Sequence, residues 1–462
     1  MVFSSCEFLF LFFPAALLVY FVSPFRIRNI ALFAVSLIFY AWGEPVYVIL
    51  MLATITVDYV CGYFVGKNRE TNRKAAKIWM IAAIVLNLGA LAFFKYGDFF
   101  VSNLNRIPGV NIPLLNIGLP IGISFYTFQA LSYVIDVYRF DAEYQKNYAS
   151  FGAYVTLYPQ LIAGPIVRYA DVDKQLRERT HSVSLFASGV RTFTCGFAKK
   201  ILLANTAGEM WETLSASETV LGSWAALAFF MFQIYFDFSG YSDMAIGMGK
   251  MMGFEFRENF YYPYCSTSIT DFWRRWHISL GTWFREYLYI PLGGNRCGKA
   301  RQYFNIFVVW LATGAWHGAS WNYILWGLYY FVLLVIEKAF LGKALSKLPS
   351  FVSRIYTLVF VFFGWWLFKF EDIGAGFSFL GTMFAGQTFT TPTVTYEILR
   401  SIVFIVIMVI ACMPYPKRLF HRAYEKSAVF RNIVPVGVLV LLIVCVAYLV
   451  NSSYNAFLYT RF

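Results

Sequence analysis

The sequence predicts an all-α protein that crosses a membrane many times. Of its 462 residues, 59% are hydrophobic and only 14% are charged, a composition that soluble domains do not have. Apolar runs close to the roughly 20 residues that a helix needs to span a bilayer recur from end to end, and we count about a dozen. No large soluble domain fits between them, so we expect one integral membrane domain over residues 1–462.

The basic residues lie in short loops, which sets the expected orientation of the chain. The net charge is +13, and lysines and arginines cluster at residues 67–77 and 417–431. Because short cytoplasmic loops are enriched in these residues, we expect both loops to face the cytoplasm. The connection at 97–115, whose only basic residue is Arg106, is expected outside. Charge distributed in this way indicates contact with membrane lipids, and we expect no nucleic-acid partner.

Two segments before the centre of the chain combine apolar residues with small or helix-breaking ones. Residues 119–138 contain small residues that suit close helix packing; packing and substrate contact both explain them, and both stay open. Residues 158–169, YPQLIAGPIVRY, contain Gly164 and Pro165, which interrupt a regular helix. Since irregular backbone at membrane depth is tolerated only inside protein or along a cavity, we interpret this segment as a cavity wall.

Asp237 and Asp243 stand out in the apolar run at 220–250. Residues six apart on a straight helix face different directions, so a site shared by both carboxylates requires a break at Ser239-Gly240. We favour a structural polar network, and the membrane setting keeps a functional role open. The seven cysteines are scattered without C-x-x-C spacing and indicate neither disulfides nor a metal site.

The stretch 268–330 carries most of the predicted chemistry, because it places His277 and His317 in tryptophan-rich apolar sequence. Ser268 and Asp271 fit a helix start, a hydroxyl cap with an acid three residues on. An apolar stripe follows at three- and four-residue spacing: Trp273, Trp276, His277, Leu280 and Phe284. The spacing predicts that His277 faces the apolar side of this helix. About sixteen residues with this charge suit an interfacial or re-entrant helix rather than a span.

His317 follows a second apolar run, 303–316, and lies in the sequence GAWHGA. The four-residue spacing of Gly314 and Gly318 lets another backbone approach closely. A further run begins at Trp321, so we expect His317 at an interruption where its imidazole can point into a cavity. The other two histidines, His181 and His421, lie in polar basic loops and are expected to be solvated.

A neutral imidazole can take the proton of a hydroxyl as that hydroxyl attacks an acyl carbon. If the acyl group arrives as a thioester, the thiolate leaves readily, so one well-placed base in a dry site suffices. The sequence contains no G-x-S-x-G elbow, Walker loop, G-x-G-x-x-G or H-E-x-x-H motif. His277 and His317 also lack an evident third ligand for a metal. Two hydrogen-bonded core histidines remain the alternative.

Five segments resemble the membrane-bound O-acyltransferase family, above all its bacterial alginate O-acetyltransferase branch: YPQLIAGPIVR, YFDFSGYSDMAIG, DFWRRWHISL, FREYLYIPLGGNR and WHGASWNYILWG. The resemblance is dense over residues 118–337, and further spans are expected in 1–117 and 338–462. It implies the family fold, a ring of about a dozen transmembrane and re-entrant helices around a central funnel.

The resemblance implies an O-acyltransferase of the bacterial plasma (inner) membrane. The acyl group, expected to be acetyl, passes from a cytoplasmic thioester donor to hydroxyls of an extracytoplasmic polysaccharide, and an extracytoplasmic partner protein completes the transfer. The implied donor is acetyl-CoA or an acylated carrier protein. His317 matches the proposed catalytic base of the family's W-H-G motif. His277 matches the histidine of W-R-x-W-H and is expected to position donor or acceptor.

Five further residues are candidates for substrate binding: Asp271, Arg274, Arg275, Arg285 and Asn322. Arg274 and Arg275 would attract a phosphate-bearing donor, and anionic lipid headgroups explain them equally well. We predict no bound metal or cofactor. Two other functions stay open: D-alanyl transfer to teichoic acid, the activity of a related branch, and a carrier or flippase for an acylated lipid or glycan. A single dense site without repeats favours the enzyme over the transporter.

Overall fold

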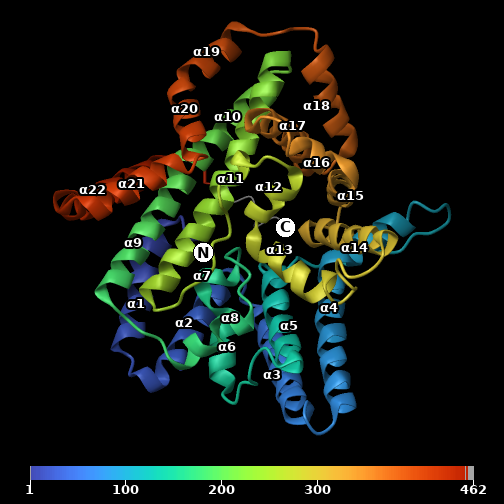
Figure 1. The fold of residues 1–462 in the computed structure, drawn as a ribbon, viewed down its shortest axis with the longest axis vertical. Coiled ribbons are helices and arrows are strands. Elements are labelled where there is room, and N and C mark those ends of the chain that lie inside the picture. The colour runs from blue at the N-terminus through green and yellow to red at the C-terminus, as the bar shows by residue number, and fades with distance from the viewer. Residues whose placement is uncertain (1, 453, 456–462) are drawn as a thin grey trace. The chain divides into compact units, whose positions relative to one another are not determined.

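The computed structural model describes residues 2–452, 454 and 455, and Figure 1 shows helices joined by loops. No strand occurs in this described part of the chain, so the all-α prediction is confirmed. The chain folds as two compact units. The first comprises Met1–Phe193 and Met244–Arg257, and the second comprises Thr194–Asp243 and Glu258–Thr460.

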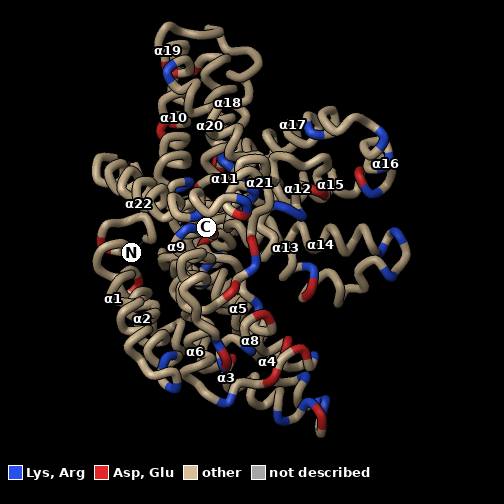
Figure 2. The backbone as a smooth tube through the Cα atoms, turned by 60° about the vertical axis from the view of Figure 1, so that its left-hand side comes forward, with Lys and Arg blue, Asp and Glu red and all other residues tan. Residues whose placement is uncertain are grey.

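The structure confirms a multi-span membrane protein. Among the described residues, seven helices are long and apolar enough to cross a membrane: Phe25–Gly43, Val48–Asn68, Arg73–Leu104, Val220–Met251, Trp321–Leu345, Ser350–Lys369 and Ala428–Asn451. A bent pair, Pro392–Arg400 and Ile402–Ala411 at 49°, makes an eighth if it counts as one span. The other apolar runs form shorter helices, which is why full-length spans are fewer than the runs in the sequence. Figure 2 shows charged residues mainly at helix ends and in connections.

The first unit is built around α5. Its helices are α1 (Phe13–Val22), α2 (Arg28–Gly43), α3 (Val48–Asn68), α4 (Arg73–Leu104), α5 (Ile123–Arg139), α6 (Tyr148–Thr156), α7 (Tyr158–Leu161), α8 (Tyr169–Arg177) and the start of α9 (Val183–Ala198). Helix α3 packs against α4 and α5, and α2 packs against α6 (Figure 1). Every residue from 123 to 137 is buried. The small residues in this segment therefore serve helix packing within the unit.

The Gly-Pro segment of the first unit breaks the helix as predicted and is buried in protein. Helix α7 ends at Leu161, and residues 163–167 are buried without helical structure. Gln160 Nε2 donates to the Tyr154 carbonyl oxygen at 2.7 Å, which provides one hydrogen bond within this irregular region. A β-carbon on Gly164 would lie only 2.8 Å from the Pro159 carbonyl oxygen, so this turn requires glycine. Its interpretation as a cavity wall stays a prediction.

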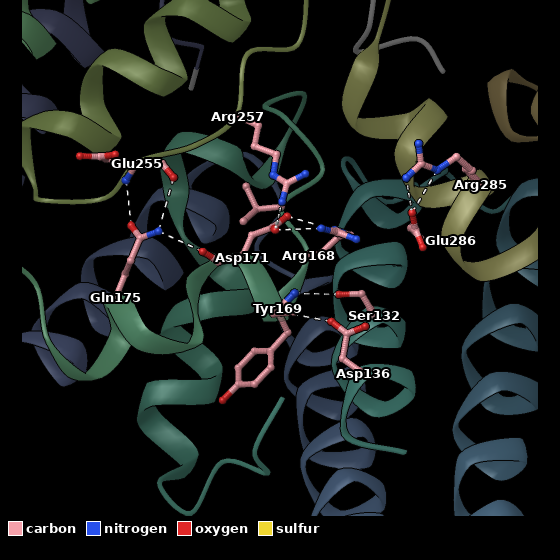
Figure 3. Close-up of polar contacts among 12 residues, drawn as sticks. Ser132, Asp136, Arg168, Tyr169, Asp171, Gln175, Glu255, Arg257, Arg285 and Glu286 are labelled. Atoms are coloured by element: carbon pink, nitrogen blue, oxygen red, sulfur yellow. Dashed lines mark hydrogen bonds and ion pairs between the residues drawn. The ribbon is translucent and has the colours of Figure 1, made fainter. Parts of the chain in front are cut away.

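Arg168, at the end of that segment, belongs to a charged network (Figure 3). Its guanidinium donates to both carboxylate oxygens of Asp171, at 3.0 and 2.9 Å, and Arg257 Nη2 lies 2.7 Å from Asp171 Oδ1. Next to it, the Glu255 backbone N–H donates to Gln175 Oε1 at 2.8 Å. These contacts fix α8 to residues 255–257 within the same unit, which gives Arg168 a structural role.

The second unit carries the stretch 268–330 as a run of short and long helices. The helices of this unit are η3 (Lys199–Ala204), α10 (Asn205–Ser215), α11 (Val220–Met251) as far as Asp243, α12 (Ile269–Arg275), α13 (Ile278–Phe284), η5 (Arg285–Tyr289), α14 (Lys299–His317), α15 (Trp321–Ile336), η6 (Glu337–Leu341), α16 (Gly342–Leu345), α17 (Ser350–Lys369), α18 (Ile373–Ala385), α19 (Pro392–Arg400), α20 (Ile402–Ala411), α21 (Tyr415–Lys426) and α22 (Ala428–Asn451). Helix α14 packs along α15, and α15 packs on α17 and α12.

Asp237 and Asp243 do not share a site, because α11 continues through Ser239-Gly240 without a break. Each carboxylate instead pairs with a different lysine of the π-helical turn η3. Lys200 Nζ lies 2.8 Å from Asp237 Oδ1 in a pair that is almost fully buried. Lys199 Nζ lies 2.6 Å from Asp243 Oδ2, and about a third of each side chain is exposed. This geometry supports the structural polar network.

Candidate active site

The helix that starts at Ser268 breaks at His277, so the predicted single helix is wrong there. The predicted start is confirmed: Ser268 Oγ accepts from the Asp271 backbone N–H at 2.9 Å. Helix α12 ends at Arg275, His277 has a left-handed φ of 47°, and α13 begins at Ile278. A distant residue stabilises the break, because the Ile278 backbone N–H donates to the Asn259 carbonyl oxygen at 2.9 Å.

His277 is nevertheless buried among apolar groups, as the stripe predicts. It is 2% exposed. Its ring lies edge-on to the rings of Phe238 in α11 and Trp316 in α14. The distances between ring centroids are 4.7 and 5.8 Å. Asn259 Oδ1 lies 3.2 Å from His277 Nδ1. Since a charged imidazolium is poorly solvated in such surroundings, this environment favours neutral imidazole, the form that can accept a proton.

His317 lies where the sequence predicts an interruption. It is the last residue of α14, the backbone is extended at Gly318, and α15 begins at Trp321. The imidazole is 2% exposed. It packs edge-on against three aromatic rings. The distances between ring centroids are 5.1 Å to Trp316, 5.0 Å to Trp326 and 5.3 Å to Phe368. A β-carbon at Gly314 would overlap the Tyr323 carbonyl oxygen, so this glycine lets α14 and α15 meet closely enough to enclose the ring.

Both histidines line one cavity of about 430 Å³ inside the second unit. Its walls are mostly apolar and aromatic, with contributions from Trp273, Trp276, Trp310 and Phe284. Trp316 contacts both imidazoles, so the two rings belong to one aromatic cluster. The structure therefore brings together two side chains that are forty residues apart in the sequence.

A second cavity of about 470 Å³ adjoins the first and is more polar at its walls. The two share seven lining residues: Thr270, Gly281, Arg285, Tyr289, Val309, Trp310 and Leu334. The second adds Glu337 and Lys338. The Glu337 carboxylate accepts from the backbone N–H groups of Ile269 and Thr270, at 2.6 and 2.8 Å. This acid is therefore occupied in capping α12, while Arg285 and Lys338 place positive charge at the cavity wall.

The five other candidate residues separate into two groups. Arg274 and Arg285 line the histidine cavity, and Arg285 also donates to Glu286 at 2.7 Å (Figure 3). Asp271, Arg275 and Asn322 are absent from the linings of both cavities described above. Arg275 pairs with Asp271 at 2.9 Å, and Asn322 Nδ2 donates to the Phe368 carbonyl oxygen at 3.1 Å. The first contact lies within α12 and the second connects α15 to α17. A substrate-binding role for the five stays a prediction.

The other two histidines lie outside this site. His181 is exposed and its Nε2 lies 2.9 Å from Tyr20 Oη in the first unit, and His421 is exposed on α21. Sequence analysis missed Asn259, which lies eighteen residues before His277 with no motif spacing to connect them. It also missed Thr313, which lines the cavity one helical turn before His317 and could have been found from that four-residue spacing.

The comparison with known proteins agrees with the motifs around the two histidines. Residues 141–368 match the family model for MBOAT, the membrane-bound O-acyltransferase family. The chain is 43% identical to the probable alginate O-acetylase of Pseudomonas aeruginosa, over 84% of this chain and 76% of the relative. It is 33% identical to the peptidoglycan O-acetyltransferase of Helicobacter pylori, over 83% of this chain and 80% of the relative.

A more distant relative is the teichoic acid D-alanyltransferase of Bacillus subtilis, which is 28% identical over 54% of this chain and 68% of its own length. The relatives therefore include both branches that the motifs suggest, with higher identity and coverage in the O-acetyltransferases. With more than two thirds of the alginate relative covered at 43% identity, the chain belongs to the membrane-bound O-acyltransferase family and is an O-acyltransferase.

Proposed function

We propose that this enzyme transfers an acetyl group from a thioester donor to hydroxyls of an extracytoplasmic polysaccharide. The observation that carries the proposal is the cavity of about 430 Å³ that both His277 and His317 line. The named activities of the relatives support the choice of acetyl group and glycan, since one is named an alginate O-acetylase and another a peptidoglycan O-acetyltransferase. The proposed location is the bacterial inner membrane.

In the proposed reaction, His317 acts as general base. Its neutral imidazole removes the proton from the attacking hydroxyl while the hydroxyl oxygen bonds to the thioester carbonyl carbon. The carbon–sulfur bond then breaks and the electron pair leaves on sulfur. A thiol has a reference pKa near 8.5, so the thiolate is a good leaving group and can receive the proton that His317 has taken. The products are an O-acetyl ester and a free thiol.

The aromatic walls support this chemistry by keeping water away from the thioester, which water would otherwise hydrolyse. Arg274 and Arg285, at the same cavity, suit the phosphates of acetyl-CoA or of an acylated carrier protein, because guanidinium groups form paired hydrogen bonds with phosphate oxygens. We infer that the donor enters from the cytoplasm. A partner protein at the outer face would carry the acetyl group onward to the glycan.

The test compares O-acetylation of cell-envelope glycan, by NMR of purified polymer, in a deletion strain carrying wild type, His317→Ala or His277→Ala at equal membrane levels. Restoration by wild type and loss with His317→Ala supports the proposal. Full restoration by His317→Ala contradicts the assignment of the base. An unchanged glycan after deletion contradicts the acceptor, and D-alanyl esters of teichoic acid would then be measured in the same strains.

Thiol release separates an enzyme from a carrier. The purified wild-type protein is expected to release free thiol from acetyl-CoA when acceptor is present. A carrier or flippase for an acylated lipid or glycan would move its cargo without releasing thiol, so absence of thiol release with every donor tested would contradict the enzyme.

A further inference from the structure

Asn259 makes the closest polar contacts around His277. Its backbone oxygen accepts from the Ile278 N–H at 2.9 Å. Its side-chain Oδ1 accepts from the Ser279 backbone N–H at 3.1 Å and from Ser279 Oγ at 2.9 Å, and lies 3.2 Å from His277 Nδ1. All three side chains are buried. One amide oxygen therefore joins the left-handed turn at His277 to the first residues of α13.

The Ser279 backbone fixes which way the Asn259 amide points. A backbone N–H can only donate, so the group facing it at 3.1 Å must be the amide oxygen. Rotating the amide by 180° would direct its NH₂ group at this N–H and set two donors against each other. The amide orientation is therefore fixed by the Ser279 backbone N–H, which can act only as a donor. An asparagine side chain can be oriented from its hydrogen bonds when one partner has a fixed role of this kind.

The amide orientation in turn fixes the histidine tautomer. An amide oxygen carries no proton, so its 3.2 Å contact with His277 Nδ1 is a hydrogen bond only if Nδ1 is protonated. The opposite tautomer would place two lone pairs against each other in a buried site. His277 Nε2 is buried and has no hydrogen-bond partner among the described residues. It is the nitrogen left with the lone pair.

The Ser279 hydroxyl is the group on this side that could reverse the assignment by donating to Nδ1. It lies 3.5 Å from His277 Nδ1 but 2.9 Å from Asn259 Oδ1, so its proton is directed to the amide oxygen. Phe238 of α11, Phe260 and Trp316 of α14 present aromatic rings to the imidazole. The charged groups on the shared cavity are Arg274 and Arg285, which keep their charge throughout the accessible pH range. The other histidine that lines this cavity is His317. Burial among these rings is what disfavours a positive charge on His277.

We propose that Asn259 is a positioning residue that holds His277 with its proton on Nδ1, so that Nε2 keeps its lone pair and accepts a hydrogen bond from a second hydroxyl of the substrate, one that is not the attacking group. The second half of this statement rests on the proposed function. It gives the two histidines different tasks: His277 orients the substrate by accepting from this second hydroxyl, and His317 removes the proton of the attacking hydroxyl. Asn259 touches neither substrate nor donor and acts through the ring it holds.

The direct test is ¹⁵N NMR of the whole protein with labelled histidine. The chain has only four histidines, so few signals need to be assigned. His277→Ala identifies the His277 signals by their loss. Wild type is expected to show a proton bonded to Nδ1 of His277 and none on Nε2, and Asn259→Ala is expected to distribute the proton between both nitrogens. A proton on Nε2 in wild type, or an unchanged Nδ1 proton in Asn259→Ala, would overturn the assignment.

Activity gives a second, independent readout. Asn259→Ala is expected to lower acetyl transfer about tenfold or more, because a wrongly held tautomer misdirects the histidine. Asn259→Asp retains an acceptor for the Nδ1 proton and adds a negative charge that favours imidazolium. It should therefore keep measurable transfer and move the acid limb of the pH–rate profile upward by about one unit. Asn111→Ala, in the exposed connection between α4 and α5, is the matched control and should behave as wild type.

The outcomes separate positioning from simple structural support. If Asn259→Asp is as inactive as Asn259→Ala, or if its profile does not move, the positioning role is wrong. If Asn259→Ala does not fold, the wild-type and Asn259→Asp spectra still decide the tautomer. A wild-type transfer rate in His277→Ala would overturn the task given to His277 under the proposed function, and the NMR signal would then judge the tautomer independently.

Discussion

His317 ends α14 with its imidazole enclosed by Trp316, Trp326 and Phe368. Replacing it with alanine removes the proposed base and leaves the aromatic walls in place. Because general base catalysis contributes about 10² to 10⁴ in rate, His317→Ala is expected to lower thiol release and acetyl transfer by at least about a hundredfold. Both can be measured with purified protein, acetyl-CoA and glycan.

The control for this prediction is His421→Ala. His421 is exposed on α21, so its removal tests whether any histidine substitution disturbs the protein. Transfer and thermal unfolding should match wild type. A small effect of His317→Ala, within about threefold of this control, would place the base elsewhere.

The Lys200–Asp237 ion pair makes a second prediction about individual residues. With both side chains almost fully buried at 2.8 Å, removing one partner leaves the other charge unpaired. Lys200→Met should therefore destabilise the protein by about 3–5 kcal/mol. Adding Asp237→Leu should recover much of that loss, since the remaining charge is gone. Thermal unfolding in detergent measures both.

The neighbouring pair provides the comparison. Lys199 and Asp243 are each about one third exposed, so solvent screens their attraction and Lys199→Met should cost about 1 kcal/mol or less. Equal losses from Lys199→Met and Lys200→Met would mean that burial does not determine the energetics of this network.

At the scale of elements, the α14–α15 junction could be predicted from sequence and the α12–α13 junction could not. The GAWHGA sequence contains the determinants of its own interruption, namely small residues, a helix end and a new start at Trp321. The break at His277 depends on Asn259, eighteen residues earlier, whose carbonyl oxygen accepts from Ile278. The spacing of apolar residues describes only neighbours along one helix. It therefore predicted correctly that the His277 side chain is buried, and predicted wrongly that the backbone is helical at His277.

The α14–α15 contact can be tested with a pair of glycines. Gly314→Ala places a β-carbon against the Tyr323 carbonyl oxygen, and such overpacking costs about 1–3 kcal/mol. Because His317 lies one turn further along α14, transfer should fall together with the melting temperature. Gly381→Ala in α18 meets no atom within 4 Å. It should leave transfer unchanged and gain up to about 1 kcal/mol from helix propensity.

Equal behaviour of the two glycine variants would show that α14 and α15 can separate without harm to the site. A loss of stability in Gly314→Ala without any loss of transfer would show that the position of His317 tolerates a shift of its helix.

At the scale of the whole molecule, composition predicted the class of protein well and the number of spans less well. High apolar content does not distinguish a helix that contacts lipid from a helix that is buried inside the protein. Helix α5 illustrates this, since residues 123–137 are all buried although their sequence resembles a span. Of the candidate site, the histidines and two arginines meet at one cavity as their motifs suggest. The adjoining cavity, with Glu337 and Lys338 in its wall, could not be predicted because folding alone brings these residues to it.

The orientation of the chain in the membrane is the last prediction, and helix α4 allows it to be tested. Helix α4 has 32 residues and is therefore about 48 Å long, well beyond the roughly 30 Å hydrocarbon core. Its two connections should then face opposite sides of the membrane. The connection before α4 belongs to the basic cluster at 67–77, which the positive-inside rule places in the cytoplasm.

Single cysteines in a background without the seven native ones can test this, with a membrane-impermeant maleimide applied to intact cells. Glu70→Cys and Asn111→Cys both replace exposed residues. Asn111→Cys should react at once, whereas Glu70→Cys should react only after permeabilisation. The reverse pattern would put the basic loop outside, so the orientation expected from the positive-inside rule would be wrong.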